Sequence, residues 1–323
     1  MASVPARNTV QECCDMQLDS QPLPEMVQTH FYMFVANVKG RWAGNSLISV
    51  MSTEFVSETA EYYRAAIEIG AIRVNGQQVS ADYILKGHDK ITHLVHLHEP
   101  ECPPIEVIAD HGGLVVVNKP SGIPCHPTSR FQKYCVLGAL ANPDMRCLHR
   151  LDLVTSGVLF LAASTCKITL DGARKIYIAR VEGFFPDATT VEKKILVLPG
   201  RSEISDRGKP ASTSFRRICY KNGHSLVECT LNTGRRHQIR VHLKSIGFPV
   251  LRDLLYGADI RVERQYESCE TAPEGLDDVE QFVIRRCKGR DLRYCGDRSF
   301  ICLHSYKSYL NGVCHTPPCY ETA

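Results

Sequence analysis

Residues 147–159 read CLHRLDLVTSGVL, and this stretch decides the fold. Asp152 lies there between polar residues and the apolar run that begins at Val158, with Arg150 two residues before it and a Thr-Ser-Gly turn after it. A turn at the beginning of a strand exposes backbone and side chain together, so Asp152 is a candidate for attack on a substrate or for proton transfer. A local salt bridge or a turn cap fits the same residues.

A second segment, residues 231–243, reads LNTGRRHQIRVHL and combines cations and amide donors with a strand, a glycine turn and a helix start. Three further motifs are KPSGIP at 119–124, KIYIA at 175–179 and DLLYG at 253–257. In this order the motifs resemble the RluA-type pseudouridine synthases, whose signature is H-R-L-D-x-x-T-S-G followed by T-G-R-x-H-Q-I-R-V-H. Five ordered motifs are far more specific than one.

The resemblance implies isomerisation of uridine in RNA to pseudouridine, with the base detached from C1′ and rejoined through C5, and with no external cofactor. Asp152 would be the catalytic carboxylate, Arg240 its orienting partner and Tyr177 the ring that stacks on the base and can help to remove the C5 proton. Arg150 would fill the space that the extruded uridine leaves. The motifs also imply substrate contacts by Lys119, His149, Thr155, Arg235, His237 and Gln238.

Two of these residues have plainer alternatives. Arg240, with Gln238 and His242 as period-two neighbours, could be a surface cation on a strand. Tyr177 lies in an alternating pattern typical of a half-buried strand, where tyrosine usually packs in the core. Only the ordered motifs favour the catalytic interpretation for both.

Composition agrees with an RNA partner. The chain has 323 residues and 44% hydrophobic content, enough for a catalytic core and a small accessory domain. The net charge is only +3, but residues 201–252 contain eleven lysines and arginines against three acids. This excess suits a phosphate backbone, and a solvated basic face is the alternative.

The fifteen cysteines include no C-x-x-C pair. His96 and His98 would point to one side of a strand and His93 to the other, so we expect no metal site and no cofactor. Residues 1–20 resemble neither a signal nor a transit peptide, and no apolar run approaches the length of a membrane span. We expect a monomer with reduced thiols, located in the cytoplasm, with nucleus or mitochondrion as alternatives.

Three regions are predicted. Residues 1–40 are irregular. Residues 41–100 resemble an S4-type RNA-binding module, with helices at 41–55 and 58–70 and two short strands around Asn75-Gly76. This part also resembles the eukaryotic branch of the family that modifies the tRNA anticodon loop, including position 32, so tRNA is the expected partner.

Residues 101–323 are predicted to form an α+β catalytic domain on a largely antiparallel sheet, with strands at 114–117, 158–162, 177–182, 211–220 and 225–230. An acidic surface insertion is expected at about 259–295. Between Gly157 and Lys175 the chain is about eight residues shorter than is usual in the family. This departure supports a rival hypothesis, a catalytically weak paralogue that binds RNA or acts as an RNA chaperone. A thiol-rich metal or redox protein is a third.

Overall fold

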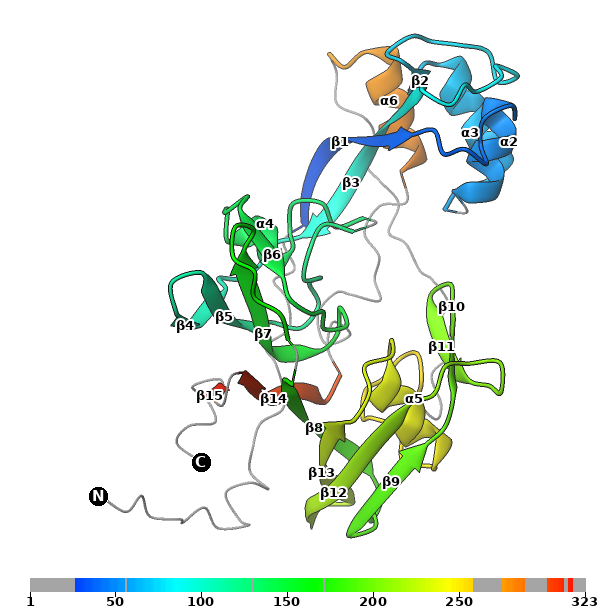
Figure 1. The fold of residues 1–323 in the computed structure, drawn as a ribbon. Helices are drawn as coiled ribbons and strands as arrows, with labels where there is room; N and C mark the ends of the chain where they lie inside the picture. The colour runs from blue at the N-terminus through cyan, green and yellow to red at the C-terminus, as the bar shows by residue number, and fades with distance from the viewer. Residues whose placement is uncertain are drawn as a thin grey trace. The chain divides into compact units, whose positions relative to one another are not determined.

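The computed structural model describes residues 27–55, 57–128, 130–170, 172–257, 275–287, 301–310 and 313–315 (Figure 1). The chain forms two compact units. The smaller unit comprises Val27–Glu99 and the described part of Tyr266–Asp291, and the larger unit comprises the described residues of Pro100–Gln265 and Leu292–Ala323. Among the described residues, no helix is both long enough and apolar enough to cross a membrane.

The smaller unit combines three helices with a three-stranded sheet of order β1-β3-β2. Its elements are β1 (Val27–Asn37), α2 (Leu47–Glu54), α3 (Ala60–Glu68), β2 (Ile72–Val74), β3 (Lys90–Pro100) and α6 (Asp278–Arg286). Ser46 and Thr59 cap α2 and α3, because each side chain accepts a backbone N–H of the first turn. The predicted helices are confirmed, although the first begins only at Leu47.

Two predictions for this unit need correction. Residues 27–37 form strand β1 and are not irregular; the outward-facing Met33 and Val35 are apolar and exposed, so the strand lacks the polar alternation that reveals a strand in sequence. Asn75 and Gly76 do form a left-handed turn, with φ of 52° and 77°. The second strand of that hairpin is reduced to the single bridge Val74–Gln77.

The described part of the predicted acidic insertion is a docked helix. Asp277 and Glu280 form a capping box at the start of α6, so the acids stabilise a helix N-terminus. Val283 is 2% exposed in the core of the smaller unit, and Phe282 stacks on Tyr62 of α3 at 5.9 Å. The prediction of an acidic surface insertion in the catalytic domain is therefore wrong for residues 275–287, which belong to the smaller unit; the rest of 259–295 lies outside the described residues.

The larger unit is an α+β fold on a mostly antiparallel sheet of order β4-β5-β7-β14-β8-β13-β12-β9, as predicted. Its main strands are β4 (Glu106–Asp110), β5 (Leu114–Lys119), β7 (Ser156–Ala163), β8 (Arg174–Glu182), β9 (Ala188–Glu192), β12 (Ser212–Lys221), β13 (His224–Leu231) and β14 (Leu303–Leu310). The remaining elements are α4 (Val136–Ala139), β6 (Met145–Cys147), β10 (Ile195–Leu198), β11 (Arg201–Ile204), α5 (Gln238–Ser245) and β15 (Val313–His315). All five predicted strands are confirmed.

The centre of this sheet explains the Thr-Ser-Gly turn. Strand β7 pairs in parallel with β14, and His304 and Ser305 lie opposite Ser156 and Gly157. Gly157 has φ of 108°, and a Cβ built there would lie 2.4 Å from the carbonyl oxygen of Ser305. Only glycine permits this approach, which places the end of the Asp152 loop against the middle of the sheet.

The shortened segment after Gly157 does not interrupt the pairing of the sheet. Strand β7 is intact and pairs with β5, β6 and β14, and the described residues between Ala163 and Arg174 contain no helix. The Arg146 guanidinium anchors this connection by donating to the carbonyls of Cys166 and Ile168, both at 3.0 Å. A tethered loop therefore takes the place of the expected helix.

Eight of the described cysteines are free thiols. Cys219 is disulfide-bonded, so the expectation of reduced thiols does not hold for that residue. Cysteine pairing depends on which chain segments meet in the fold, and spacing in the sequence does not report it.

Candidate active site

A cleft of about 930 Å³ opens in the larger unit around the residues of the two longest motifs. Five basic side chains line it, namely Arg150, Lys175, Arg235, Arg236 and Arg240. Asp152 is the one carboxylate among the described lining residues. The volume is large enough for a small organic ligand, and the basic lining suits a negatively charged one.

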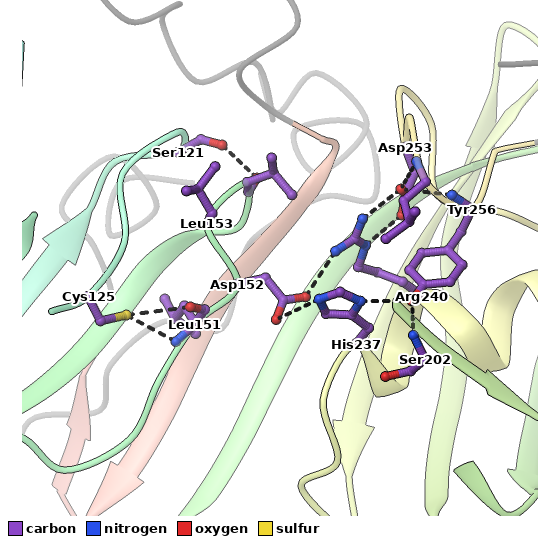
Figure 2. A network of polar contacts seen from close by, with 12 residues as sticks. Ser121, Cys125, Leu151, Asp152, Leu153, Ser202, His237, Arg240, Asp253 and Tyr256 are labelled. Atoms are coloured by element: carbon purple, nitrogen blue, oxygen red, sulfur yellow. Dashed lines mark hydrogen bonds and ion pairs between the residues drawn. The ribbon is translucent and has the colours of Figure 1, made fainter. Parts of the chain in front are cut away.

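Backbone hydrogen bonds fix the loop that carries Asp152. The backbone carbonyl of Asp152 accepts the Thr155 N–H at 3.1 Å, which closes a turn. On either side, the Ser121 hydroxyl donates to the Val154 carbonyl at 2.6 Å, and the Leu151 N–H donates to the Cys125 sulfur at 3.2 Å. The loop is thus held by its main chain, and the carboxylate, 25% exposed, faces Arg240 and His237 (Figure 2).

Arg240 forms an ion-pair network with two carboxylates. Its Nε and Nη2 donate to the two oxygens of Asp253 at 2.7 and 2.8 Å, and its Nη1 donates to Asp152 Oδ2 at 3.2 Å. Asp253 is 1% exposed and also accepts the N–H groups of Leu255 and Tyr256. The bidentate pair with Asp253 locks the guanidinium plane, so that its third edge is aimed at Asp152.

His237 approaches the other oxygen of Asp152. Its Nε2 lies 3.8 Å from Asp152 Oδ1, and its Nδ1 lies 2.7 Å from the Tyr256 hydroxyl oxygen. That hydroxyl accepts the Ser202 N–H at 2.8 Å, so its own proton is best donated to His237 Nδ1. Burial lowers the pKa of His237 to about 4, so the ring is neutral, with its N–H at Nε2 facing the carboxylate.

Tyr177 lies on β8, is 6% exposed and lines the cleft. Burial, followed by the charge of Asp152, raises the pKa of its hydroxyl. The phenol therefore keeps its proton at neutral pH. It offers a ring face and a donor, and it can take up a proton only after giving its own away.

Residues 113–245 match the family model described as RNA pseudouridylate synthase. The chain is 30% identical over 291 residues to a Saccharomyces cerevisiae protein named tRNA pseudouridine(31) synthase, with 72% of each chain covered. The chain belongs to the RNA pseudouridylate synthase family.

Two other relatives of the family are similar over a comparable stretch of this chain. A mouse protein named Pseudouridylate synthase RPUSD2 is 38% identical over 250 residues, which cover 72% of this chain and 45% of that protein. A Saccharomyces cerevisiae protein named tRNA pseudouridine(32) synthase, mitochondrial, is 36% identical over 262 residues, which cover 74% of this chain and 56% of that protein. This chain thus spans just under half the length of the mouse relative.

The structure brings together most of the motif residues that the sequence of this pseudouridylate synthase family member singled out. Asp152, Tyr177, Arg240 and His237 surround one cleft. Arg240 lies on helix α5, so the alternative of a surface cation on a strand is wrong. Tyr177 packs in the core cluster, as the plainer alternative expects, and also lines the cleft, where the catalytic role stays a prediction.

The predicted substrate contacts divide into residues that line the cleft and residues whose polar atoms are occupied within the protein. Arg150 and Arg235 line the cleft with exposed or half-buried side chains. Thr155 also lines it, and its buried Oγ1 has no hydrogen-bond partner among the described residues, which leaves an atom for a ligand to satisfy. His149 lines the cleft too, but its Nε2 accepts the Phe160 N–H, and burial lowers its pKa to about 3.

Two predicted substrate contacts have their side-chain polar atoms occupied within the protein: Lys119, which does not line the cleft, and Gln238, which does. Lys119 is 0% exposed, and its ammonium donates to the carbonyls of Pro120, Ile123 and Leu153 at 2.7 to 3.1 Å. Gln238 is 3% exposed, and its amide is engaged by Thr233, Arg235, Ser212 and Thr213. Both side chains position loops of the cleft, because their polar atoms are already occupied inside the protein.

Sequence reasoning missed the roles of Asp253 and Tyr256. Their motif, DLLYG at 253–257, is recognisable in the sequence, but the motif alone assigned neither residue a role. Both residues also lie beyond residues 113–245, the segment that the family model matches. The spacing carries a usable signal, because the Asp253 carboxylate accepts the N–H of Tyr256 three residues later in a tight turn. That turn directs the carboxylate to Arg240 and the phenol to His237.

Proposed function

We propose that this protein is an RNA pseudouridine synthase that isomerises a uridine in structured RNA, with Asp152 as the catalytic carboxylate. One observation supports this most strongly: a partly exposed carboxylate in a basic cleft, 3.2 Å from a buried arginine that a second carboxylate holds in place. Such an acid is oriented for attack on a sugar or base carbon, because its partner cannot rotate away.

Each residue then has a defined task. Arg240 and the Nε2–H of His237 approach opposite oxygens of Asp152 and orient the carboxylate. Tyr177 stacks on the extruded uracil and donates from its protonated hydroxyl. Arg150, exposed at the cleft, occupies the space in the RNA that the extruded nucleotide vacates. Asp253 and Tyr256 are positioning residues that act through Arg240 and His237.

The substrate that we propose is tRNA, modified in the anticodon loop. Two relatives are named for positions 31 and 32 of tRNA. Unpaired loops present bases that can be turned outward, and the cations that line the cleft suit the phosphates on either side. The smaller unit is proposed to contact the RNA as an S4-like module through Arg41, Arg64, Arg73, Lys86 and Lys90. A monomeric state and a cytoplasmic location stay predictions.

The test is a single-turnover assay of the full chain on unmodified tRNA transcripts, with pseudouridine mapped by carbodiimide-dependent reverse-transcription stops. We expect a stop in the anticodon loop, and Asp152→Ala should lower its rate of formation on the order of 10⁴-fold. RNA affinity should be largely kept, because one acid contributes little to phosphate contacts.

Asp144→Ala is the matched control, because Asp144 is an exposed acid outside the cleft lining. Unchanged product formation by Asp152→Ala would refute the catalytic assignment. Tight RNA binding with no product on any tRNA would favour another RNA substrate or the RNA-chaperone hypothesis. The intact pairing of β7 weighs against the latter, because the shortened segment leaves the catalytic loop anchored.

A further inference from the structure

Three side chains of the smaller unit converge on one point. His98 Nε2 lies 3.1 Å from His96 Nδ1 and 3.3 Å from the sulfur of Cys287. The three ligand atoms lie within 4.8 Å of one another, and all three residues are half-buried. This cluster belongs to the other unit from the cleft, so it is separate from the proposed function.

The fold brings these residues together by two independent routes. His96 and His98 are two apart on β3, so their side chains leave the same face of the strand. Cys287 is the C-terminal cap of α6 and is 189 residues from His98 in the sequence. Packing of Val283 and Phe282 against the core of the smaller unit holds that cap near β3; Figure 1 draws α6 in orange within this unit.

Hydrogen bonding alone accounts poorly for this geometry. An imidazole nitrogen either donates one proton or accepts through one lone pair, yet His98 Nε2 contacts two polar atoms at short range. A cation shared by the three atoms removes the conflict. In a tetrahedral zinc centre with Zn–N near 2.05 Å and Zn–S near 2.3 Å, ligand atoms are separated by roughly 3.3 to 3.7 Å. Two of the three separations are close to that range, and the third, between His96 and Cys287, is at most 4.8 Å.

We propose that His96, His98 and Cys287 bind a zinc-class divalent cation, with the fourth position left to water. Imidazole and thiolate are typical ligands of zinc, whereas magnesium and calcium prefer oxygen ligands. The ion joins the end of α6 to β3 and so fastens a segment from the C-terminal half of the chain to the N-terminal unit. Binding of the ion to the folded chain stabilises that unit by mass action.

The test uses the full chain without a histidine tag, purified without chelator and analysed for metal by mass spectrometry. We expect one zinc ion per chain. Replacement of zinc by Co²⁺ should produce thiolate-to-cobalt charge-transfer absorption, which reports the sulfur ligand directly. Chelation should lower the melting temperature of the folded protein.

Cys287→Ser should abolish the charge-transfer absorption and the stoichiometric zinc, and His98→Gln should remove the zinc. The controls are Cys166→Ser, a half-buried free thiol in the larger unit, and His88→Gln, an exposed histidine of the smaller unit. Both should keep metal and spectrum.

Wild-type protein that takes up no stoichiometric zinc, or a Co²⁺ spectrum without thiolate absorption, would overturn the proposal whatever the variants do. Loss of the band in Cys166→Ser would also overturn it, because the metal would then be bound elsewhere. A negative wild-type result therefore overturns the proposal even if a variant fails to fold, and the variants assign the sulfur ligand to Cys287.

Discussion

Two buried cations flank the cleft loop of the larger unit, and they are satisfied in different ways. Lys119 donates to three backbone carbonyls, whereas Arg240 donates to two carboxylates. Burial lowers the pKa of Lys119 to about 8. Burial also acts to lower the pKa of Arg240, but the Asp253 and Asp152 carboxylates outweigh it and raise that pKa.

The difference separates two tasks. Carbonyl dipoles hold the Lys119 ammonium and thereby shape the loop around Leu153, next to Asp152, without cancelling its charge. The carboxylates at Arg240 supply both geometry and countercharge, so the same guanidinium positions Asp152 and stays fully charged. Lys119 organises the main chain of the loop, and Arg240 organises the side chain of Asp152.

Breaking the carboxylate side of this comparison should have the largest effect on stability. Asp253→Asn leaves the buried Arg240 with Asp152 as its one remaining carboxylate partner, and we expect a loss of about 3 to 5 kcal/mol in the free energy of unfolding. Chemical denaturation measures it. Asp187→Asn is the control, because Asp187 pairs with Arg217 while its side chain is 91% exposed. A loss in Asp253→Asn no larger than in the control would show that the bidentate pair is not a structural anchor.

Removing the carbonyl-bound cation should change how stability depends on pH. Because the pKa of Lys119 is about 8 in the folded state and near 10.5 when unfolded, the folded state releases this proton first. Between these values the unfolded state binds more protons, so stability rises with pH. Relative to Lys119→Met, the wild type should gain about 2 kcal/mol between pH 7.5 and 9.5.

Denaturation curves of both proteins at the two pH values give this difference. The exposed Lys209, changed to Met, is the matched control and should show the same pH dependence as the wild type. A constant difference between the wild type and Lys119→Met would mean that the Lys119 ammonium is not desolvated.

Removal of the Tyr256 hydroxyl, which contacts His237, should have the smallest effect on stability. Tyr256→Phe leaves the buried Ser202 N–H without its acceptor and His237 Nδ1 without its donor, at a cost on the order of 1 kcal/mol. The His237 proton can then move to Nδ1, so we expect kcat to fall about tenfold with little change in RNA affinity. Tyr220→Phe, at an exposed ring, is the control. A change in KM with kcat intact would assign His237 to RNA binding.

Local pattern was enough for most of the larger unit. Strands β5, β7, β8, β12 and β13 carry enough β-branched and apolar residues to be recognised, and the ordered motifs identified Asp152, Arg240 and Tyr177. The sequence pattern did not predict whether the side chain of a motif residue points into the protein or into the cleft. Lys119 and Gln238 belong to the motifs, yet their side chains are buried and their polar atoms are occupied within the protein. The sequence does not show this, because the partners are supplied by loops that meet only in the packed fold.

By itself, the sequence determined the family, the candidate site residues Asp152, Arg240 and Tyr177, and the strand pattern, because these depend on residue type and on spacing over a few residues. Tertiary structure decided that Asp253 anchors Arg240, that α6 packs in the N-terminal unit and that Cys287 meets His98. These contacts join residues whose proximity depends on burial of apolar surface across the whole fold, which short-range spacing does not encode.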